Sequence, residues 1–562
     1  MKNRNRQNFI FGIIAGTVAI AVAAAFRIFV GGIFLPELAS QTVFSLTPGQ
    51  TESSSVETFG SLAKYSVFTI AIITNLALYG SLAEFLDKIY IRLADRGFVV
   101  NLLQLSFIPY FIMAIIAAIF LQLNELLTGS SEIQFALLFL LLPNVVFGRT
   151  LIYLFQRENN TTKSAQLPTE PSGIINRHKP VLRTTTTNSS QAAPKISRRQ
   201  FIIMSASAVV VVLFLWARGF LSFFNSQQQP SETDTSTYSP HPLNFRAGSI
   251  FAEQALAPFI ASEVTPNEKF YRVDTNIITP SVDVNSWRLE VLGLIKNGPM
   301  QLTYDQIKAM PSMSEYATLE CISDKIDGDL ISTAYWKGVS LKSILEKAQV
   351  LPQATYIVFR CVDGYDVGIP LDRGLMYGTI LAYEMNGAPL PGEHGFPIRA
   401  IVPGLYGMMN AKWIKEIELV DRIYQGFWQR RGWANNAKYQ THSKIVFPGD
   451  ALRSRFLEMS ANVAPTVGNK SPIAGIAFAG DRGISKVEVS TDGGNTWQTA
   501  NIKDPLSSNS WVLWALDWIP RNKGKYNIVV RATDKAGNLQ TAEVRDNYPN
   551  GATGYHLIIE NA

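Results

Sequence analysis

Residues Leu381–Val420 read LAYEMNGAPLPGEHGFPIRAIVPGLYGMMNAKWIKEIELV and carry the most specific signals in the chain. Its Asn386-Gly387 pair predicts a tight hairpin, because these two residue types accept the positive φ angles that such a turn needs. The stretch also holds His394, the only histidine between residues 270 and 439. It therefore combines a strand-turn signal with a side chain that can carry chemistry.

On the N-terminal side of this stretch, strand and helix signals are mixed. Trp287–Val291 alternates with period two and predicts a strand. Thr303–Gln306 has the spacing of a capping box and predicts a short helix that ends near Pro311. Leu341–Gln349 predicts an amphipathic helix. Because these elements do not alternate regularly, an α+β domain is expected rather than a doubly wound sheet.

On the C-terminal side, the signals for helices stop after about Lys444. Ser485–Ser490 alternates strictly before an Asp-Gly-Gly turn, and Tyr526–Ala532 precedes a second glycine-containing turn. Short strands between Gly and Asp turns, over roughly 115 residues, predict a β-sandwich of immunoglobulin type. No pair of cysteines lies in this region, so it is not an antibody-type domain.

The chain has two cysteines, Cys321 and Cys361, so no disulfide framework exists, although one bridge between them stays open. Cys321 lies in ATLECIS, residues 317–323, where a strand is expected to end and a loop to begin. A thiolate at a strand end can be a nucleophile or a ligand of a soft metal. A nucleophile usually has a histidine as its base. A buried, inert thiol is the third alternative.

Before residue 225 the apolar residues form runs long enough to cross a membrane. A bilayer core of about 30 Å needs about 20 residues of apolar helix. Five spans are predicted, and the fourth contains Pro143 and can be extended by Thr150–Phe155. The runs are Phe9–Phe26, Tyr65–Ala83, Leu102–Leu123, Ile133–Gly148 and Gln200–Ala217.

Basic residues determine the predicted orientation of these spans. Lys and Arg cluster before the first run, between the second and third, and between the fourth and fifth, whereas loops 35–64 and 124–132 are mainly acidic. This pattern predicts an integral membrane protein with five transmembrane helices and a cytoplasmic N-terminus. The region after residue 225 would then be extracytoplasmic, in a periplasm, a lumen or at the cell exterior.

The positions of the histidines indicate whether the predicted spans could bind a haem. The five histidines are His178, His241, His394, His442 and His556, and none lies within a predicted span. No haem is therefore predicted, since a pair of histidines on facing helices is its usual ligand set in a membrane. The four-helix region is expected to serve as an anchor or docking surface, with a quinone site or partner site as the alternative.

A segment before the fifth run, Ser197-Arg198-Arg199-Gln200-Phe201-Ile202, resembles the twin-arginine signal that exports folded proteins. The alternative is that two arginines at the cytoplasmic edge of a helix simply obey the positive-inside rule. No small-residue cleavage site follows, so the fifth helix is expected to stay as an anchor.

Several stretches, in order, resemble the sulfite oxidase family of molybdopterin-dependent oxidoreductases, in its membrane-anchored bacterial type. The resemblance covers about residues 265–562. The matching segments are Thr318–Cys321, Gly328–Leu345, residues 363–370 (DGYDVGIP), Leu381–Val420 and, in the sandwich, GISKVEVSTDGGNTW, VRATDKAGNLQ and NGATGYH.

The resemblance implies a catalytic metal site at Cys321, whose thiolate would bind molybdenum beside the two dithiolene sulfurs of one molybdopterin. Thiolate is a soft, anionic donor that suits such a metal. His394, Arg399 and Lys412 match positions that bind the anionic cofactor, whose buried phosphate needs paired donors. Taken singly, each of these three would be read as a surface salt bridge.

Further residues carry over from the same resemblance. Arg272, in FYRVD, matches a catalytic arginine that attracts an oxyanion substrate near the metal. Asp363 and Arg482 match cofactor-binding positions more weakly, and Arg482 is equally an exposed charge of the sandwich. The sandwich matches the family's dimerisation domain, which implies a possible homodimer.

Two departures from the family pattern concern the substrate. The segment after the cysteine reads Ile322–Lys325, ISDK, rather than a Gly-Asn-Arg type of loop, and no tyrosine matches within Phe427–Trp433. Sulfite and an S- or N-oxide are therefore both kept as substrates. Neither a Cys-x-x-Cys-His site nor a cytochrome b5-like segment is present, so a redox partner protein or the quinone pool is expected to exchange electrons with the metal.

The fold class is thus a transmembrane helical bundle, an α+β sulfite-oxidase-like molybdopterin domain and an immunoglobulin-like β-sandwich. The net charge is only +6, and the Lys and Arg residues do not form a basic stripe, so no nucleic acid partner is expected. A cell-surface binding, adhesion or sensor protein that keeps the fold without metal is the alternative function.

The predicted segments are the four-helix transmembrane region 1–155, a disordered cytoplasmic linker 156–199, the fifth transmembrane helix 200–224, a linker 225–264, the molybdopterin-binding domain 265–440 and the dimerisation-type domain 441–562.

Overall fold

A computed structural model shows two compact units, a helical one within residues 1–227 and a β-rich one formed mainly by residues 228–562. Each unit is described by itself. The structure describes residues 2–30, 34–48, 50–51, 61–95, 108–128, 140–165, 263–276, 279–448 and 465–562.

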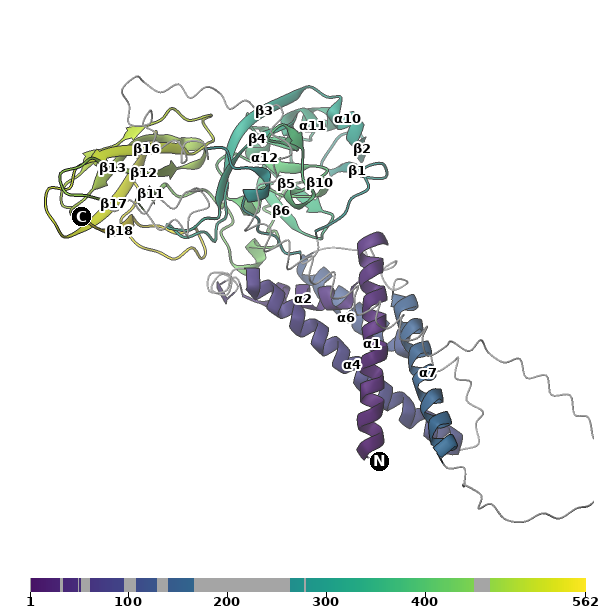
Figure 1. Cartoon of the computed structure of the whole chain (residues 1–562). Helices are drawn as coiled ribbons and strands as arrows, with labels where there is room; N and C mark the ends of the chain where they lie inside the picture. Colours follow the sequence, from purple (N-terminus) through teal and green to yellow (C-terminus); the bar gives the residue numbers. More distant parts are fainter. Residues whose placement is uncertain are drawn as a thin grey trace, which may run out of the picture. The chain divides into compact units, whose positions relative to one another are not determined.

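Long helices form the N-terminal unit (Figure 1). Pro109 and Pro143 lie in the first turns of α6 and α7, where the missing N–H of proline is not needed. A helix in the loop after the first span, α2, was not predicted. The helices are α1 (Lys2–Val30), α2 (Leu35–Leu46), α4 (Ser61–Asp95), α6 (Ile108–Thr128) and α7 (Leu141–Ala165).

Two of these helices contain segments long and apolar enough to cross a membrane, Arg4–Arg27 and Lys64–Ile89. Shorter apolar segments cover Ile108–Phe120 and Leu141–Phe155. The predicted fifth span, residues 200–224, lies outside the described residues. Helix α7 continues to Ala165, so its C-terminal end lies within the segment 156–199 that is predicted to be a linker.

Glycines bring α1 and α4 into close contact. A Cβ atom at Gly12 would lie 2.5 Å from the carbonyl oxygen of Tyr79 and 2.7 Å from the Cα of Gly80. A Cβ at Gly16 would likewise overlap the Tyr79 side chain. This Gly-x-x-x-Gly spacing is typical of helices that pack backbone to backbone.

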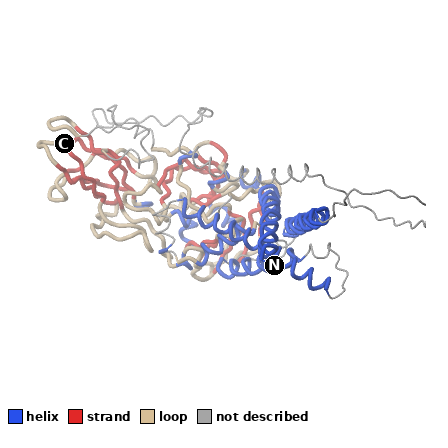
Figure 2. The backbone as a smooth tube through the Cα atoms, turned by 60° about the horizontal axis from the view of Figure 1, so that its bottom comes forward, coloured by secondary structure: helices blue, strands red, loops and turns tan. Residues whose placement is uncertain are grey.

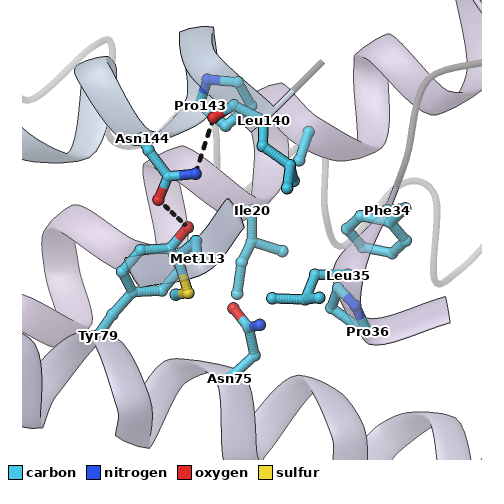
Figure 3. A pocket seen from close by; sticks show the side chains of 11 residues that line it. Ile20, Phe34, Leu35, Pro36, Asn75, Tyr79, Met113, Leu140, Pro143 and Asn144 are labelled. Carbon is cyan, nitrogen blue, oxygen red and sulfur yellow. Dashed lines mark hydrogen bonds between the residues drawn. The ribbon is translucent and has the colours of Figure 1, made fainter. Parts of the chain in front are cut away.

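Polar side chains join the helices inside this unit. The Tyr79 hydroxyl donates to Asn144 Oδ1 at 3.1 Å, and Asn144 Nδ2 donates to the carbonyl of Leu140 at 2.7 Å, beside a small pocket (Figure 3). Asp87 accepts from Arg4 and Asn8 of α1, and Arg27 pairs with Glu37 of α2 at 2.6 Å. These contacts tie α1 to its neighbours.

The first domain of the β-rich unit contains two sheets, of which one is mixed and the other antiparallel (Figure 1); its strands are drawn red in Figure 2. One sheet has the order β2-β1-β10-β5-β6, with β1 parallel to β10, and the other has the order β3-β4-β7-β8 with β9 on β7. The strands are β1 (Arg288–Gly293), β2 (Met300–Thr303), β3 (Ser312–Glu320), β4 (Ile331–Ser340), β5 (Tyr356–Cys361), β6 (Asp366–Pro370), β7 (Ile380–Met385), β8 (Ala388–Pro389), β9 (Arg399–Ile401) and β10 (Ile414–Val420). The helices are α10 (Tyr304–Lys308), α11 (Leu341–Ala348) and α12 (Leu371–Leu375).

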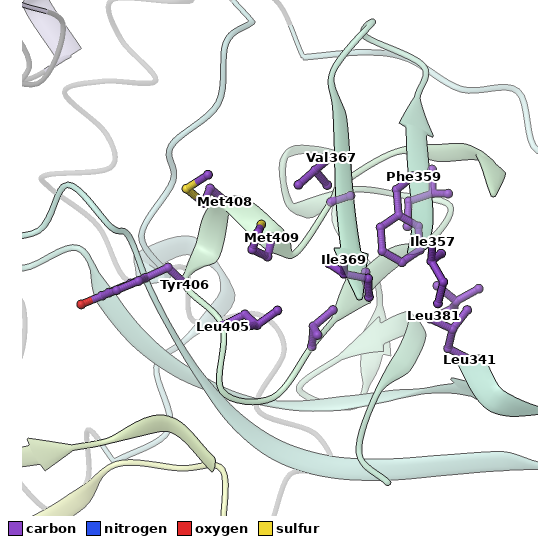
Figure 4. Close-up of a cluster of buried hydrophobic side chains, with 14 of the residues drawn as sticks. Leu341, Ile357, Phe359, Val367, Ile369, Leu381, Leu405, Tyr406, Met408 and Met409 are labelled. Atoms are coloured by element: carbon purple, nitrogen blue, oxygen red, sulfur yellow. The ribbon is translucent and has the colours of Figure 1, made fainter. Parts of the chain in front are cut away.

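The main core of this domain lies between the sheets and α11. Ile357, Phe359 and Ile369 from the first sheet pack with Leu341 and Leu381 (Figure 4). Burying each such side chain contributes about 1.5–3 kcal/mol to folding. This core supports the strand ends from which the site is built.

The C-terminal domain is a β-sandwich of two four-stranded sheets, as predicted. One sheet has the order β11-β12-β16-β15 and the other β14-β13-β17-β18. The strands are β11 (His442–Phe447), β12 (Ser471–Phe478), β13 (Ile484–Ser490), β14 (Gln498–Thr499), β15 (Asn501–Ile502), β16 (Val512–Trp518), β17 (Lys525–Asp534) and β18 (His556–Asn561).

The two domains are joined by buried polar contacts. Thr318 of β3 donates from its N–H to the carbonyl of Asn509 at 3.0 Å, and its hydroxyl accepts from the N–H of Trp511 at 2.8 Å. Glu263 forms a buried 2.7 Å ion pair with Lys503 of the sandwich, while Thr265, two residues on, bonds to Thr333 of β4. The stretch 263–265 is therefore held by both domains.

Candidate molybdopterin site

Cys321 follows directly on β3, as predicted. The full length of β3 pairs with β4, and the N–H of Cys321 donates to the carbonyl of Leu330 at 2.9 Å. The N–H of Asp324 then donates to the carbonyl of Cys321 at 3.0 Å, which closes a tight turn over residues 321–324. The Cys321 side chain is 8% exposed and forms no disulfide with Cys361.

The thiol of Cys321 lies 3.0 Å from the hydroxyl oxygen of Ser323. Burial raises the pKa of Cys321 to about 11, although the hydroxyl and N–H of Ser323 oppose this effect. The thiolate therefore requires a nearby positive centre, such as a bound metal ion, to persist at neutral pH.

Two tyrosines that the sequence did not single out lie near the thiol. Burial raises the pKa values of Tyr271 and Tyr439 well above their usual range, and the charge of Cys321 adds to this effect on both. The Tyr439 hydroxyl accepts from the N–H of Glu320 at 3.3 Å. Only a glycine fits at Gly407, because a Cβ there would overlap the Tyr271 hydroxyl.

Arg399, the first residue of β9, places a buried guanidinium near the same two tyrosines. The side chain is 5% exposed, and burial lowers the pKa of Arg399 to about 10, while Tyr271 and Tyr439 oppose this effect. It donates to the carbonyls of His394 and Asn410 at 3.2 and 3.4 Å, and its Nε has no partner. Among the described residues, no carboxylate forms an ion pair with it.

His394 ends a short 3₁₀ turn, η5 (Gly392–His394), and is 3% exposed. Its Nε2 lies 2.8 Å from the carbonyl oxygen of Asn267, which can only accept, so Nε2 carries the hydrogen. Burial lowers the pKa of His394 to about 3, and the nearby cations Arg399 and Lys412 add to this effect. The imidazole is therefore neutral, with a lone pair on Nδ1.

Gly395 explains how His394, Arg399 and Lys412 come together. It has a φ of +115°, and a Cβ there would lie 3.0 Å from the Lys412 Cβ and 3.1 Å from the Arg399 Cβ. The chain can turn between the two cations only because this residue lacks a side chain.

Lys412 and Arg272 share one acid, Asp274. Lys412 Nζ lies 3.1 Å and Arg272 Nε 2.9 Å from Asp274 Oδ2. Burial lowers the pKa of Lys412 to about 8, although Asp274 opposes this effect. Burial disfavours the charge of Asp274, yet nearby cations, Lys412 foremost, hold its pKa well below the usual range. The Arg272 side chain is 40% exposed.

Asp363 and Arg482 are placed differently. Asp363 accepts from Asn276 Nδ2 at 2.7 Å, and burial raises its pKa, while Lys412 is close enough to oppose that effect. Arg482 instead pairs with Asp534 at 2.9 Å and donates to the carbonyl of Tyr439 at 3.0 Å. Asp363 thus belongs with the cationic group, whereas the role of Arg482 at the cofactor stays a prediction.

These residues fit an anionic cofactor that brings its own metal ligands. The described residues contain no cluster of three or more His, Cys, Asp or Glu side chains that could hold a metal ion, so Cys321 would be a single protein ligand. The unpartnered Nε of Arg399 is a buried donor that an anion would satisfy. Molybdopterin supplies both the dithiolene sulfurs and the phosphate.

Two family models match the chain. One, described as the oxidoreductase molybdopterin binding domain, matches residues 276–428, and the other, described as the Mo-co oxidoreductase dimerisation domain, matches residues 437–550. They follow one another in the predicted order.

Several known proteins are similar to the chain. The mitochondrial sulfite oxidase of Homo sapiens is 30% identical over 352 residues, which are 55% of this chain and 64% of that protein, so the chain spans less than two thirds of that protein's length. The uncharacterized oxidoreductase YuiH of Bacillus subtilis (strain 168) is 33% identical over 177 residues, which cover 31% of this chain and 87% of that protein. The sulfane dehydrogenase SoxCD structure from Paracoccus pantotrophus aligns with a TM-score of 0.45 and 20% identity, over 60% of this chain and 98% of that one.

The sequence resemblance is therefore confirmed by both family models and by relatives that share the same domain, and the chain belongs to the sulfite oxidase family of molybdopterin-dependent oxidoreductases.

Proposed function

We propose that the chain is a membrane-anchored molybdenum-cofactor oxidoreductase that transfers an oxygen atom to or from a small polar substrate, sulfite or an S- or N-oxide. One observation carries this proposal. The buried guanidinium of Arg399 has an unpartnered Nε and no acidic partner among the described residues, and it shares Tyr271 and Tyr439 as neighbours with Cys321. Burying a cation of this kind has a high desolvation free energy unless an anion binds beside it.

In this proposal Cys321 holds the metal, Arg399 and Lys412 hold the cofactor's anionic groups, and His394 binds an N–H or O–H group of the cofactor, while Asp363 lies close enough to Lys412 to interact with its charge. The cofactor, when bound, supplies a metal that takes up and releases electron pairs during oxygen-atom transfer. The neutral His394 presents a lone pair on Nδ1, so it accepts a hydrogen bond where Arg399 and Lys412 donate.

Substrate binding is assigned to Tyr271 and Arg272. The Tyr271 hydroxyl, with a raised pKa, stays protonated and can donate to a substrate oxygen without giving up its proton. Arg272 is partly exposed and carries a permanent positive charge, so it would attract an oxyanion. The same donors suit an S-oxide or N-oxide oxygen, which leaves both directions of transfer within the proposal.

Membrane anchoring is supported by the two long apolar helices, α1 and α4, and by an exposed apolar row on the shorter apolar helix α6. Phe111, Ile115 and Ile119 lie one turn apart on α6, and each is more than half exposed. Exposed apolar rows of this kind are stable in lipid rather than in water. Five spans, a cytoplasmic N-terminus, export of the folded domain by the twin-arginine segment and an extracytoplasmic site are all part of the proposal.

Electron transfer and assembly complete the proposal. A redox partner protein or the quinone pool would exchange electrons with the metal, since no haem is expected in this chain. A homodimer through the sandwich is supported by the match of residues 437–550 to the dimerisation domain.

The decisive experiment is to purify the full chain in detergent from a host that makes molybdopterin, and to measure molybdenum by mass spectrometry and the pterin by fluorescence. About one metal per chain is expected, and Cys321→Ser should abolish turnover while the protein stays folded. A folded, metal-free chain would overturn the proposal and favour the alternative of a binding or sensor protein.

A further inference from the structure

The hydroxyl of Ser323 lies within hydrogen-bond distance of the sulfur of Cys321. The two atoms are 3.0 Å apart, a distance at which either could be the donor in the metal-free chain. A metal-bound thiolate has no proton, so the hydroxyl becomes the donor once a metal is bound. The hydrogen bond then points at the sulfur that carries the metal–ligand bond.

Three contacts hold Ser323 in this position. The N–H of Cys321 is bonded to Leu330, and the N–H of Asp324 is bonded back to the carbonyl of Cys321, which fixes the turn at both ends. The carbonyl of Ser323 itself accepts from Asn547 Nδ2 at 2.7 Å. Asn547 lies in the C-terminal domain, between β17 and β18, and is 6% exposed. The hydroxyl is therefore placed by the fold and not by the sulfur alone.

We infer that Ser323 is a positioning residue that tunes the reduction potential of the metal through its hydrogen bond to Cys321, with Asn547 of the sandwich holding it in place. This inference rests on the proposed binding of molybdenum at Cys321.

The sign of the effect follows from charge. Reduction of the metal places more negative charge on its sulfur ligands, and a hydrogen bond to a sulfur stabilises that charge. The hydroxyl therefore favours the reduced metal and raises its potential. Removing the hydroxyl should lower the potential and shift the sulfur-to-metal charge-transfer absorption to longer wavelength.

The test compares four variants of the full-length, metal-loaded protein. Ser323→Ala removes the hydroxyl, while Ser323→Thr keeps it and Ser323→Val has the shape of threonine without it. Ser443→Ala is the matched control, because it removes a different buried hydroxyl that donates to Gln540 at 2.8 Å. The readouts are molybdenum per chain, the charge-transfer band and the one-electron potential from a spectroscopic redox titration.

The alanine and valine variants should keep their metal and shift the one-electron equilibrium about tenfold toward the oxidised state, which equals about 59 mV. The threonine variant and the Ser443→Ala control should keep the wild-type potential. A wild-type potential in loaded Ser323→Ala and Ser323→Val would overturn the inference and leave the proposed function intact. Loss of metal from both variants would also overturn it, since the hydroxyl would then serve to retain the metal. A wild-type protein without molybdenum would overturn the proposed function itself.

Discussion

At the scale of single residues, Arg399 and His394 show opposite responses to burial. Arg399 keeps its charge in a buried site with carbonyl, aromatic and phenolic neighbours, and its guanidinium lies 4.9 Å from the ring centre of Trp336. His394 is neutral and donates to a carbonyl. A site that stores one uncompensated positive charge has a free-energy cost that an anionic ligand can offset.

Arg399→Met tests this cost. The cofactor-free variant should be at least as stable as the cofactor-free wild type, by about 0–3 kcal/mol in free energy of unfolding, because it removes a buried charge without a partner. The same variant should retain far less molybdopterin. Urea denaturation of both cofactor-free proteins and pterin content after purification measure the two effects. A cofactor-free variant that is strongly destabilised would show that Arg399 serves packing instead.

His394→Gln tests the protonation state. The pKa of His394 is about 3 in the folded chain and about 6.5 in the unfolded chain, so the unfolded state binds the proton first as the pH falls. The contribution of His394 to the free energy of unfolding should therefore be fully present above pH 6.5. About 3 kcal/mol of that contribution should be lost as the pH falls from 7 to 4.

The measurement is the difference in free energy of unfolding between cofactor-free wild type and His394→Gln at several pH values. Glutamine keeps a donor for the Asn267 carbonyl, and the other titrating groups cancel in the difference. Parallel curves from pH 7 to pH 4 would mean that the histidine is not buried in its neutral form.

At the scale of elements, local chemistry made some parts of the fold predictable. The capping box at Thr303 and Gln306 forms as expected at the start of α10, and Asn386 and Gly387 adopt φ angles of 51° and 79° in the turn from β7 to β8. Each signal depends on residues within a few positions of one another. Cys321 at the end of β3 was predictable for the same reason.

Other parts of the site depend on distant segments and left no local signal. Tyr271 precedes Arg272 and Tyr439 lies at the edge of the sandwich, and only the tertiary fold brings both to Cys321. The family resemblance predicts that Arg399 and Lys412 bind the cofactor, but it could not show that Arg482 pairs with Asp534. Helix α2 was missed because residues 35–46 form a short helix within a loop assigned by its acidic charge.

Gly395→Ala is the prediction at this scale. The new methyl group would meet the Cβ atoms of Lys412 and Arg399, in a backbone conformation that alanine rarely adopts. We expect a loss of about 1–3 kcal/mol in free energy of unfolding and a marked loss of cofactor. Gly298→Ala is the control, because it has a φ of +75° with no atom within 4 Å of the new methyl group, so it adds strain alone. Equal effects of both variants on cofactor content would contradict this role of Gly395.

At the scale of the whole molecule, the buried pair Glu263–Lys503 couples the segment that leads into the first domain to the sandwich. Lys503→Met should lower the free energy of unfolding by about 3–5 kcal/mol, because it leaves a buried carboxylate without its partner. Replacing both residues by methionine should recover most of that loss. Denaturation of the wild type, Lys503→Met and the double variant measures the change, and a double variant that is no more stable than Lys503→Met would contradict the explanation.

Export is the second prediction at this scale, and it concerns residues outside the described structure. Lysine at both Arg198 and Arg199 should retain the folded C-terminal domains in the cytoplasm, because the twin-arginine pathway reads the arginine pair and not charge alone. Protease accessibility in spheroplasts reports the outcome. Lysine at Arg177 and Arg183 is the control for positive charge, and an accessible domain in the Arg198/Arg199 variant would refute the signal.

The clamped stretch from Glu263 to Thr265 has a mechanical consequence. A tether under tension at this point pulls on the sandwich through Lys503 and on β4 through Thr333 at the same time. In a chain anchored in a membrane, as proposed, a pull on this stretch would therefore act on both domains together and not on one of them alone.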